Sequence, residues 1–273
     1  MIDSIKKSSI EFFNTNGLPS KKLENWKFTS SKNFKNFNKS LSSDEVKKIE
    51  SDELSIVFIN GVLDKDSLEN FKFADLIEVK NLNELTKKEL LYCSESFLNE
   101  SMFNLGVSEF ENGSYISFKE NSVIEEVINI KNYFFENGQN ERVSSFNIFH
   151  INERSEISII EEDIKENFSI FNLKLNKFIC ENSSIFKHGK SYNDDSQTHS
   201  LSYNYYQIEQ DVALNVDSMV KSSFFNKEFI EVDLNKVGSD AKINILNLGK
   251  EEQHVDNNIL INHKAEHCTS FQH

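Results

Sequence analysis

Four short segments in the second half of the chain begin at a constant interval, and this recurrence limits the fold more than any other feature. The segments start at Ser155, Ser183, Asp211 and Ser239, each 28 residues after the one before it. Each start is a small polar residue that leads into alternating apolar and polar residues, the pattern of a β-strand. A strand-containing repeat of this length predicts a β-solenoid from about residue 143 to residue 273. The alternative is an antiparallel sandwich, in which three strands at spacings of about 8 to 12 residues would give the same interval.

The charge of the chain limits its partners. The net charge is −14, from 44 acidic and 30 basic residues that form no long block of one sign. Because nucleic-acid affinity comes mainly from clustered Lys and Arg, neither nucleic acid nor an anionic membrane surface is expected as a partner. No apolar run reaches the roughly 20 residues of a membrane-spanning helix, and no signal peptide is visible, so a cytoplasmic location is expected. The cysteines, Cys93, Cys180 and Cys268, are widely spaced, as in proteins that keep free thiols.

The first 110 residues have a mixed pattern. Apolar residues at helical spacing predict a helix that ends at Asn16-Gly17, a second helix at Ser42–Asp52, and one or two more between Leu82 and Leu105. Leu54–Leu63 has the pattern of a strand that runs into an Asn60-Gly61 turn, which is a strong hairpin signal. The segment from residue 17 to residue 29 is predicted to be a loop that its apolar side chains attach to the body, with Leu23, Trp26 and Phe28 as the anchors.

The pattern changes from helical to alternating near Gly113. We therefore predict a helical or α+β domain over residues 1–110 and a β-helix core over residues 111–273. A solenoid needs an atypical terminal unit to cover its open end, and the sequence up to His273 contains no closing helix or polar cap. We expect either that the core is incomplete at its C-terminal side or that a partner covers it.

Three groups of residues resemble the SufB/SufD family, the scaffold proteins of the SUF system for iron-sulfur cluster assembly, and most closely its SufD branch. The first is Gly17–Thr29, similar to the family's N-terminal block "GLPT-R-K-x-E-x-W-K-Y-T". The second runs from Phe97 through Gly113 to Ile130, similar to the family's entry into its β-helix, with Val127 where proline is usual. The third is Gln253–Ser270, similar to a segment before the family's last coils, with departures at Ile259 and Glu266.

The resemblance implies a fold, a function and partners. The fold would be a right-handed parallel β-helix behind an N-terminal helical domain. The function would be that of a non-catalytic scaffold, paired with a SufB-like chain and the SufC ATPase or with a second copy of itself. No cofactor would be bound permanently, although an iron-sulfur cluster could be held transiently at a partner interface. Family members continue with more coils, a histidine-bearing segment and C-terminal helices that dock SufC, so the resemblance also implies that this C-terminal portion is missing here.

Metal-capable side chains are densest near the end of the sequence. His254, His263, His267 and Cys268 are the candidate ligands, with His273 nearby, because imidazole and thiolate suit iron or zinc. The alternative is an ordinary strand and turn, in which His263 shares a strand face with its apolar neighbours at residues 259 and 261. A single cysteine among scattered histidines does not form a structural metal signature.

The sequence predicts no catalytic residues. Glu161-Glu162, and Asp194-Asp195 with His199, could be acid/base pairs, but adjacent residues point to opposite faces of a strand, so solvated turns are the expected interpretation. Tyr203 and Tyr205 could stack on a sugar, but their spacing of two favours packing on a sheet face. The alternative function is a β-solenoid lyase or hydrolase of acidic polysaccharide, which would need carboxylates and cationic side chains along one groove.

Overall fold

The structure is a computed structural model, and the residues that it describes are 2–39, 49, 51–86, 95–136, 140–165, 168–193, 198–221, 224–249 and 252–273. The helix predicted at Ser42–Asp52 lies almost entirely outside the described residues, as do Cys93 and the pair Asp194-Asp195. Among the helices of the described residues, none combines the length and the apolar character that crossing a bilayer requires.

Two long sheets that face each other form the body of the protein. Sheet A contains, in spatial order, β15 (His254–His263), β13 (Phe225–Leu234), β11 (Thr198–Ile208), β9 (Ile170–Cys180), β7 (Glu141–Ile151), β5 (Ser114–Phe118) and β4 (Ile77–Asn81), with β1 (Asn38–Lys39) also beside β7. Sheet B contains β16 (Thr269–Gln272), β14 (Asp240–Leu248), β12 (Ala213–Lys221), β10 (Ile185–Asn193), β8 (Glu156–Lys165), β6 (Ile128–Phe134), β2 (Ser55–Ile59) and β3 (Val62–Leu63).

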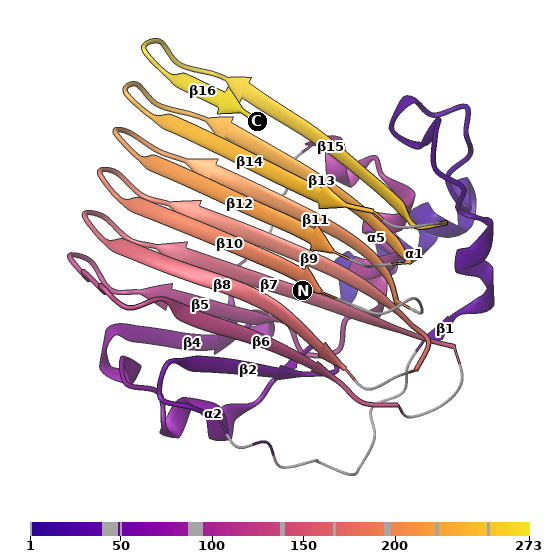
Figure 1. Ribbon diagram of the computed structural model, residues 1–273, viewed down its shortest axis with the longest axis horizontal. Coiled ribbons are helices and arrows are strands. Elements are labelled where there is room, and N and C mark those ends of the chain that lie inside the picture. Colours follow the sequence, from indigo (N-terminus) through magenta and orange to yellow (C-terminus); the bar gives the residue numbers. More distant parts are fainter. Residues whose placement is uncertain are drawn as a thin grey trace.

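The chain alternates between the two sheets, so that β7 to β16 form five successive laps of two strands each (Figure 1). Every pairing among these strands is parallel, and the antiparallel pairs β2–β3 and β4–β5 lie at the N-terminal end of the stack. The prediction of a mainly β, parallel solenoid is therefore confirmed, and the antiparallel sandwich is excluded.

The strand pairing reproduces the predicted interval. In sheet B, Ile185 pairs with Ala213, which lies 28 residues further along the chain. The preceding and following laps differ slightly in length, because Glu156 pairs with Ile185 and Ala213 pairs with Asp240, at separations of 29 and 27 residues. The repeat seen in the sequence is therefore the length of one lap.

A residue with left-handed backbone geometry marks the corner between sheet A and sheet B in each lap. These residues have φ between +52° and +85° and are Asn121, Arg154, Ser183, Asp211, Gly238 and His267. Asn, Asp and Gly adopt this conformation readily, which explains why small polar residues recur at the predicted interval. The residue after each corner points inward: Ser155, Ser184 and Ser239 donate their hydroxyl hydrogen bonds to backbone carbonyls of the corner or of the previous lap.

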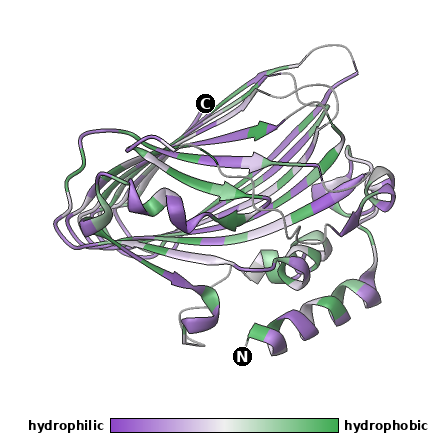
Figure 2. Cartoon of the chain, turned by 90° about the horizontal axis from the view of Figure 1, so that it is seen from below, coloured by the Kyte–Doolittle hydropathy of each residue, from purple (hydrophilic) through white to green (hydrophobic). Residues whose placement is uncertain are grey.

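Helices from the N-terminal part cover the outer face of sheet A. They are α1 (Ile2–Asn16), α4 (Glu95–Leu98) and α5 (Ser101–Glu109), with the 3₁₀ helices η1 (Glu24–Trp26), η2 (Lys32–Asn36) and η4 (Leu82–Glu84), while α2 (Lys65–Glu69) and η3 (Ala74–Leu76) lie near β2 and β4. The helix α5 packs on β7 and β9, and α1 packs on α5, outside the stacked strands (Figures 1 and 2).

The local predictions for the N-terminal part are largely confirmed. Gly17 ends α1 with φ of +66°, and its N–H donates to Phe13 at 2.7 Å. Asn60 and Gly61 both have positive φ and connect the antiparallel strands β2 and β3 as predicted. The division of the chain at residue 110 stays a prediction; β2 and β4 precede that residue, and both are paired within the two sheets.

Candidate functional site: the polar interior of the solenoid

The space between the two sheets is apolar on one side and polar on the other. Next to the corners, buried side chains such as Phe178, Phe186 and Leu214 fill the interior. Toward the opposite ends of the strands, the buried inward side chains become polar: Glu161 and Asp163 of β8, Asn172, Lys174 and Asn176 of β9, His188 and Lys190 of β10, Ser200, Ser202 and Asn204 of β11, Ser218 of β12, and Asn226 and Glu228 of β13. We call the hydrogen-bonded charged members of this set, Glu161, Asp163, Lys174, His188, Lys190 and Glu228, the interior network.

Glu161 lies at the centre of one half of the interior network. Its carboxylate accepts a hydrogen bond from Asn176 Nδ2 at 3.1 Å and lies 3.0 Å from His188 Nε2 and 3.5 Å from Lys174 Nζ. Burial by itself would raise the pKa of Glu161, but the ammonium of Lys174 and the hydrogen bond from His188 outweigh it and hold the pKa at about 2. The carboxyl group is therefore ionised at neutral pH.

Lys174 is held between two carboxylates. Its ammonium donates to Asp163 Oδ1 at 2.7 Å, in addition to its contact with Glu161. Burial lowers the pKa of Lys174, but these negative charges outweigh burial and raise the pKa above its usual value. Asp163 also accepts from Asn172 and Asn132, so that it links three strands.

His188 is completely buried and occupied at both ring nitrogens. Its Nδ1 lies 2.7 Å from the hydroxyl of Tyr206, and its Nε2 lies 3.0 Å from Glu161. Burial lowers the pKa of His188 despite the nearby carboxylate. A neutral ring satisfies both contacts if the Tyr206 hydroxyl donates to Nδ1 and the Nε2–H donates to Glu161.

Glu228 is the centre of the other half of the interior network. It forms a salt bridge with Lys190, and both side chains are almost completely buried. Glu228 also accepts from Asn204 Nδ2 at 2.8 Å and from Ser218 Oγ at 3.1 Å. These four residues come from β10, β11, β12 and β13, so the interactions join successive laps through the interior.

The interior network is suited to fixing strand register and not to transforming a substrate. Its charged groups are excluded from solvent and are bonded to one another, whereas a general acid or base must reach the reacting atom of a substrate. Removing one member would leave a buried charge without its partner, which is strongly unfavourable. A shift of one strand by one residue would do the same for the whole strand.

The low pKa of Glu161 predicts a specific pH dependence. Because the pKa in the folded state is below the unfolded value of about 4.3, the stabilisation is fully present above that value and is lost as the pH falls toward 2. We expect the difference in unfolding free energy between the unsubstituted protein and Glu161→Gln to narrow as the pH falls from about 5 to about 3. Urea denaturation at each pH measures this difference, and a constant difference would contradict the assignment of the low pKa.

The sequence interpretation of Glu161-Glu162 as a solvated turn was wrong. Both residues lie within β8, and Glu161 points into the interior with 4% exposure. The signal was present in the strand phase, because Glu161 is two and four residues after the inward Ile159 and Ile157. Tyr203 and Tyr205 pack on the outer face of sheet A as predicted.

Three of the predicted metal ligands lie in the last described lap. His267 is the left-handed corner residue of that lap, and Cys268 takes the inward position that serine holds in other laps, donating from Sγ to Lys236 O at 3.2 Å. His263 lies on the inward face with Ile259 and Ile261, as the alternative interpretation predicted, and its Nε2 is 2.9 Å from Ser270 Oγ.

His254 lies at the other end of β15, nine residues from His263 and therefore about 30 Å away. Its ring stacks on Phe225 at 5.4 Å between centroids, and its Nε2 lies 2.9 Å from Thr29 Oγ1. The four candidates are thus not brought together. In the part of the chain that the structure describes, no three His, Cys, Asp or Glu side chains are placed to hold one metal ion. The metal assignment stays a prediction.

The segment from Gly17 to Thr29 is attached to sheet A through a second buried polar cluster. Trp26 is fully buried, and its Nε1 donates to Glu100, which also accepts from the Tyr203 hydroxyl at 3.1 Å. Burial raises the pKa of Glu100, against the effect of these donors. Lys227 Nζ lies 5.1 Å from the Trp26 ring and 2.5 Å from Asp256.

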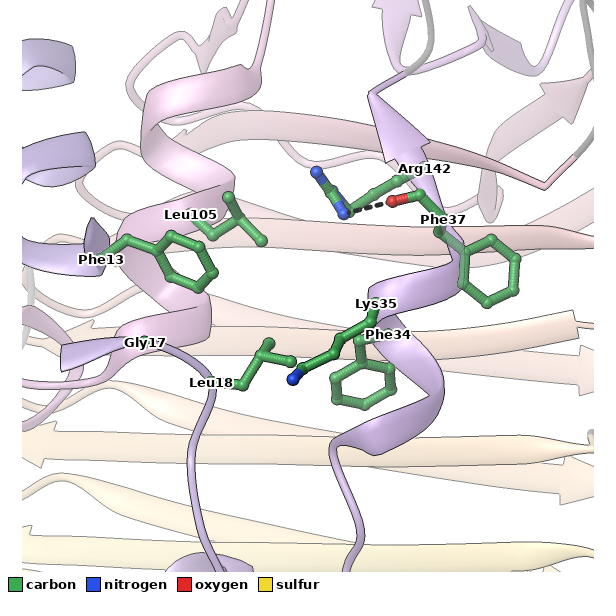
Figure 3. A pocket seen from close by; sticks show the side chains of 8 residues that line it. All are labelled: Phe13, Gly17, Leu18, Phe34, Lys35, Phe37, Leu105 and Arg142. Atoms are coloured by element: carbon green, nitrogen blue, oxygen red, sulfur yellow. Dashed lines mark hydrogen bonds between the residues drawn. The ribbon is translucent and has the colours of Figure 1, made fainter. Parts of the chain in front are cut away.

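A pocket of about 520 Å³ lies between the helices and sheet A (Figure 3). Its lining residues are Phe13, Gly17, Leu18, Phe34, Lys35, Phe37, Leu105 and Arg142. Arg142 donates to Phe37 O at 2.9 Å and makes two hydrogen bonds of 2.6 Å to Glu109. The guanidinium group therefore fastens η2 and α5 to β7, at the edge of the pocket.

Comparison with known proteins identifies the family. A family model described as "SUF system FeS cluster assembly, SufBD core domain" matches residues 134–273, slightly more than half of the chain. The matched residues include all five laps and therefore the whole interior network. No curated protein matches the chain. The chain belongs to the SufB/SufD family of the SUF system for iron-sulfur cluster assembly.

Proposed function

We propose that the chain is a non-catalytic scaffold subunit of the SUF system, of the SufD kind, and that it acts in the cytoplasm in a complex with SufB-like and SufC-like chains. The family match over residues 134–273 carries this proposal, because it covers the solenoid itself. The SufD assignment is supported by Gly17–Thr29, which resembles the SufD N-terminal block and which Trp26 and Thr29 attach to sheet A.

The chemistry of the interior supports a scaffold role. Every charged side chain of the interior network is bonded to another member, and the buried Glu161 and Glu228 contact lysines instead of a substrate-accessible cavity. A rigid stack of laps keeps its outer surfaces in fixed relative positions, which suits a protein that aligns partner chains. In this proposal an iron-sulfur cluster is cargo held at a partner interface, and the chain has no resident cofactor.

Co-expression with the SUF proteins of the same source tests the proposal. We expect the affinity-tagged full-length protein to retain a SufB-like chain and a SufC-like chain through purification, and a tag-only sample to retain neither. A parallel experiment replaces the SufB-like chain with a SufD-like chain. Selective binding of the SufD-like chain would assign this protein to the SufB position instead. Failure of the folded full-length protein to bind any of these chains would contradict the scaffold proposal.

A further inference from the structure

Three polar side chains form a row inside the solenoid next to the interior network. Asn172 of β9 pairs with Ser200 of β11, which pairs in turn with Asn226 of β13. All three residues have about 1% exposure and lie on the inward faces of their strands. The next places in the row, on β7 and β15, are occupied by Val143 and Val255, so the polar part is limited to three laps.

The row carries buried polar atoms that have no hydrogen-bond partner. They are Asn172 Oδ1, Ser200 Oγ and both amide atoms of Asn226, together with Oγ1 of the neighbouring Thr198. Buried polar atoms are almost always paired, because leaving them unpaired costs free energy. Four of these five atoms are oxygens, and three successive strands bring them side by side. The row therefore has the chemistry of a site for a guest that oxygen atoms can bind.

The interior network beside this row has an excess of negative charge. It contains three carboxylates, Glu161, Asp163 and Glu228, and two ammonium groups, Lys174 and Lys190, while both ring nitrogens of its histidine are satisfied in the neutral form. The half-exposed Lys165, at the end of β8, donates to a backbone carbonyl near that end. A buried charge without compensation is strongly unfavourable and is normally neutralised by a partner or a metal ion.

The excess charge lies against the row. Asp163 Oδ2 accepts from Asn172 Nδ2 at 2.9 Å, which leaves Asn172 Oδ1 as the free oxygen of that amide. Neighbouring strands are about 4.8 Å apart, so an ion between the oxygens of two adjacent strands would lie about 2.4 Å from each. This distance fits an ion of the size of Ca²⁺, for which oxygen distances are about 2.3 to 2.6 Å.

From these observations we infer that the row formed by Asn172, Ser200 and Asn226 binds a monovalent cation of the size of sodium. A sodium ion has nearly the radius of Ca²⁺, and its single charge balances the one excess carboxylate. Amide and hydroxyl oxygens are suitable ligands for such a hard cation. The inference concerns the interior of the solenoid and goes beyond the scaffold role, since it holds whether or not the chain binds SUF partners.

Thermal unfolding of the full-length protein in sodium chloride and in choline chloride at equal ionic strength tests this inference. A ligand that binds only the folded state raises the Tm, and we expect about 3 to 6 °C when sodium is present at ten times its dissociation constant. Ser200→Ala removes the middle oxygen and is expected to abolish the difference between the salts. Ser158→Ala, on the outer face of β8, is expected to retain it.

A second measurement does not depend on the variants. Crystals of the unsubstituted protein soaked in thallium(I) are expected to show an anomalous peak between Asn172, Ser200 and Asn226. Equal Tm values in the two salts together with only water density at the row would overturn the inference. A sodium-dependent shift that Ser200→Ala retains in full would overturn it as well, because the ion would then bind elsewhere.

Discussion

Replacing Lys190 with methionine is expected to lower the free energy of unfolding by about 3 to 5 kcal/mol, as found when one partner of a buried ion pair is removed. Lys190 is the cation that contacts Glu228, and both side chains are almost completely buried between the sheets. Methionine is similar in length but carries no charge, so Glu228 would keep only the neutral donors Asn204 and Ser218. Urea denaturation followed by circular dichroism measures the change.

Lys187 provides a matched control on the same strand. It lies on the opposite face of β10, its side chain is 54% exposed, and it lies 3.6 Å from the exposed Glu156. Because exposed ion pairs contribute little, Lys187→Met is expected to change the unfolding free energy by less than about 1 kcal/mol. Equal effects of the Lys190 and Lys187 variants would show that the interior network does not stabilise the solenoid as described.

Replacing Trp26 with alanine is expected to lower the free energy of unfolding by about 3 to 5 kcal/mol, the range measured when large buried aromatic side chains are removed. The indole ring is fully buried, contacts the rings of Phe34 and Phe229 at 6.1 Å between centroids, and donates to the buried Glu100. Its loss would leave both a cavity and a carboxylate with one donor fewer. Limited proteolysis should in addition cut the segment near residue 26 more rapidly.

Phe28 is the control for this second prediction. It belongs to the same segment, two residues after Trp26, but is 78% exposed. Phe28→Ala is therefore expected to change the unfolding free energy by less than about 0.5 kcal/mol, as is usual for surface substitutions. If Trp26→Ala were as mild as Phe28→Ala, the attachment of the N-terminal segment to sheet A would be incorrect.

The lap length could be predicted from the sequence because each corner has a local requirement. A left-handed residue such as Ser183 or Asp211 is needed once per lap, and the inward strand pattern follows it directly. Small differences between laps do not hide this signal. The pairing of laps then follows, since strands of equal phase stack in register.

The interior network could not be predicted in the same way because it depends on contacts between laps. Glu161 contacts Lys174, 13 residues later, and His188, 27 residues later, and those distances follow only from the coiled path of the chain. Along the strand itself, a charged residue next to another charged residue suggests a solvated position. The inward phase of Glu161 was the one local sign of its burial.

The anchoring of the N-terminal segment was predictable only in part. Trp26 is buried as expected, whereas Leu23 and Phe28 are exposed, because the short helix η1 turns a single side chain of the segment toward sheet A. The acceptor of the indole N–H, Glu100, lies 74 residues away, and nothing near Trp26 in the sequence indicates it.

The account depends on laps that stack in parallel register, and a disulfide trap tests this most directly. Asp217 on β12 pairs with Asn244 on β14, and the Asn244 amide donates to the Asp217 carboxylate at 2.8 Å on the outer face. Neighbouring strands are about 4.8 Å apart, within the Cα range of a disulfide. Asp217→Cys with Asn244→Cys is expected to form an intramolecular disulfide under mild oxidation, and peptide mapping identifies it. Asp217→Cys with Leu248→Cys, shifted by four residues or about 13 Å, is not expected to do so. Failure of the in-register pair to link more readily than the shifted pair would contradict the stacked solenoid.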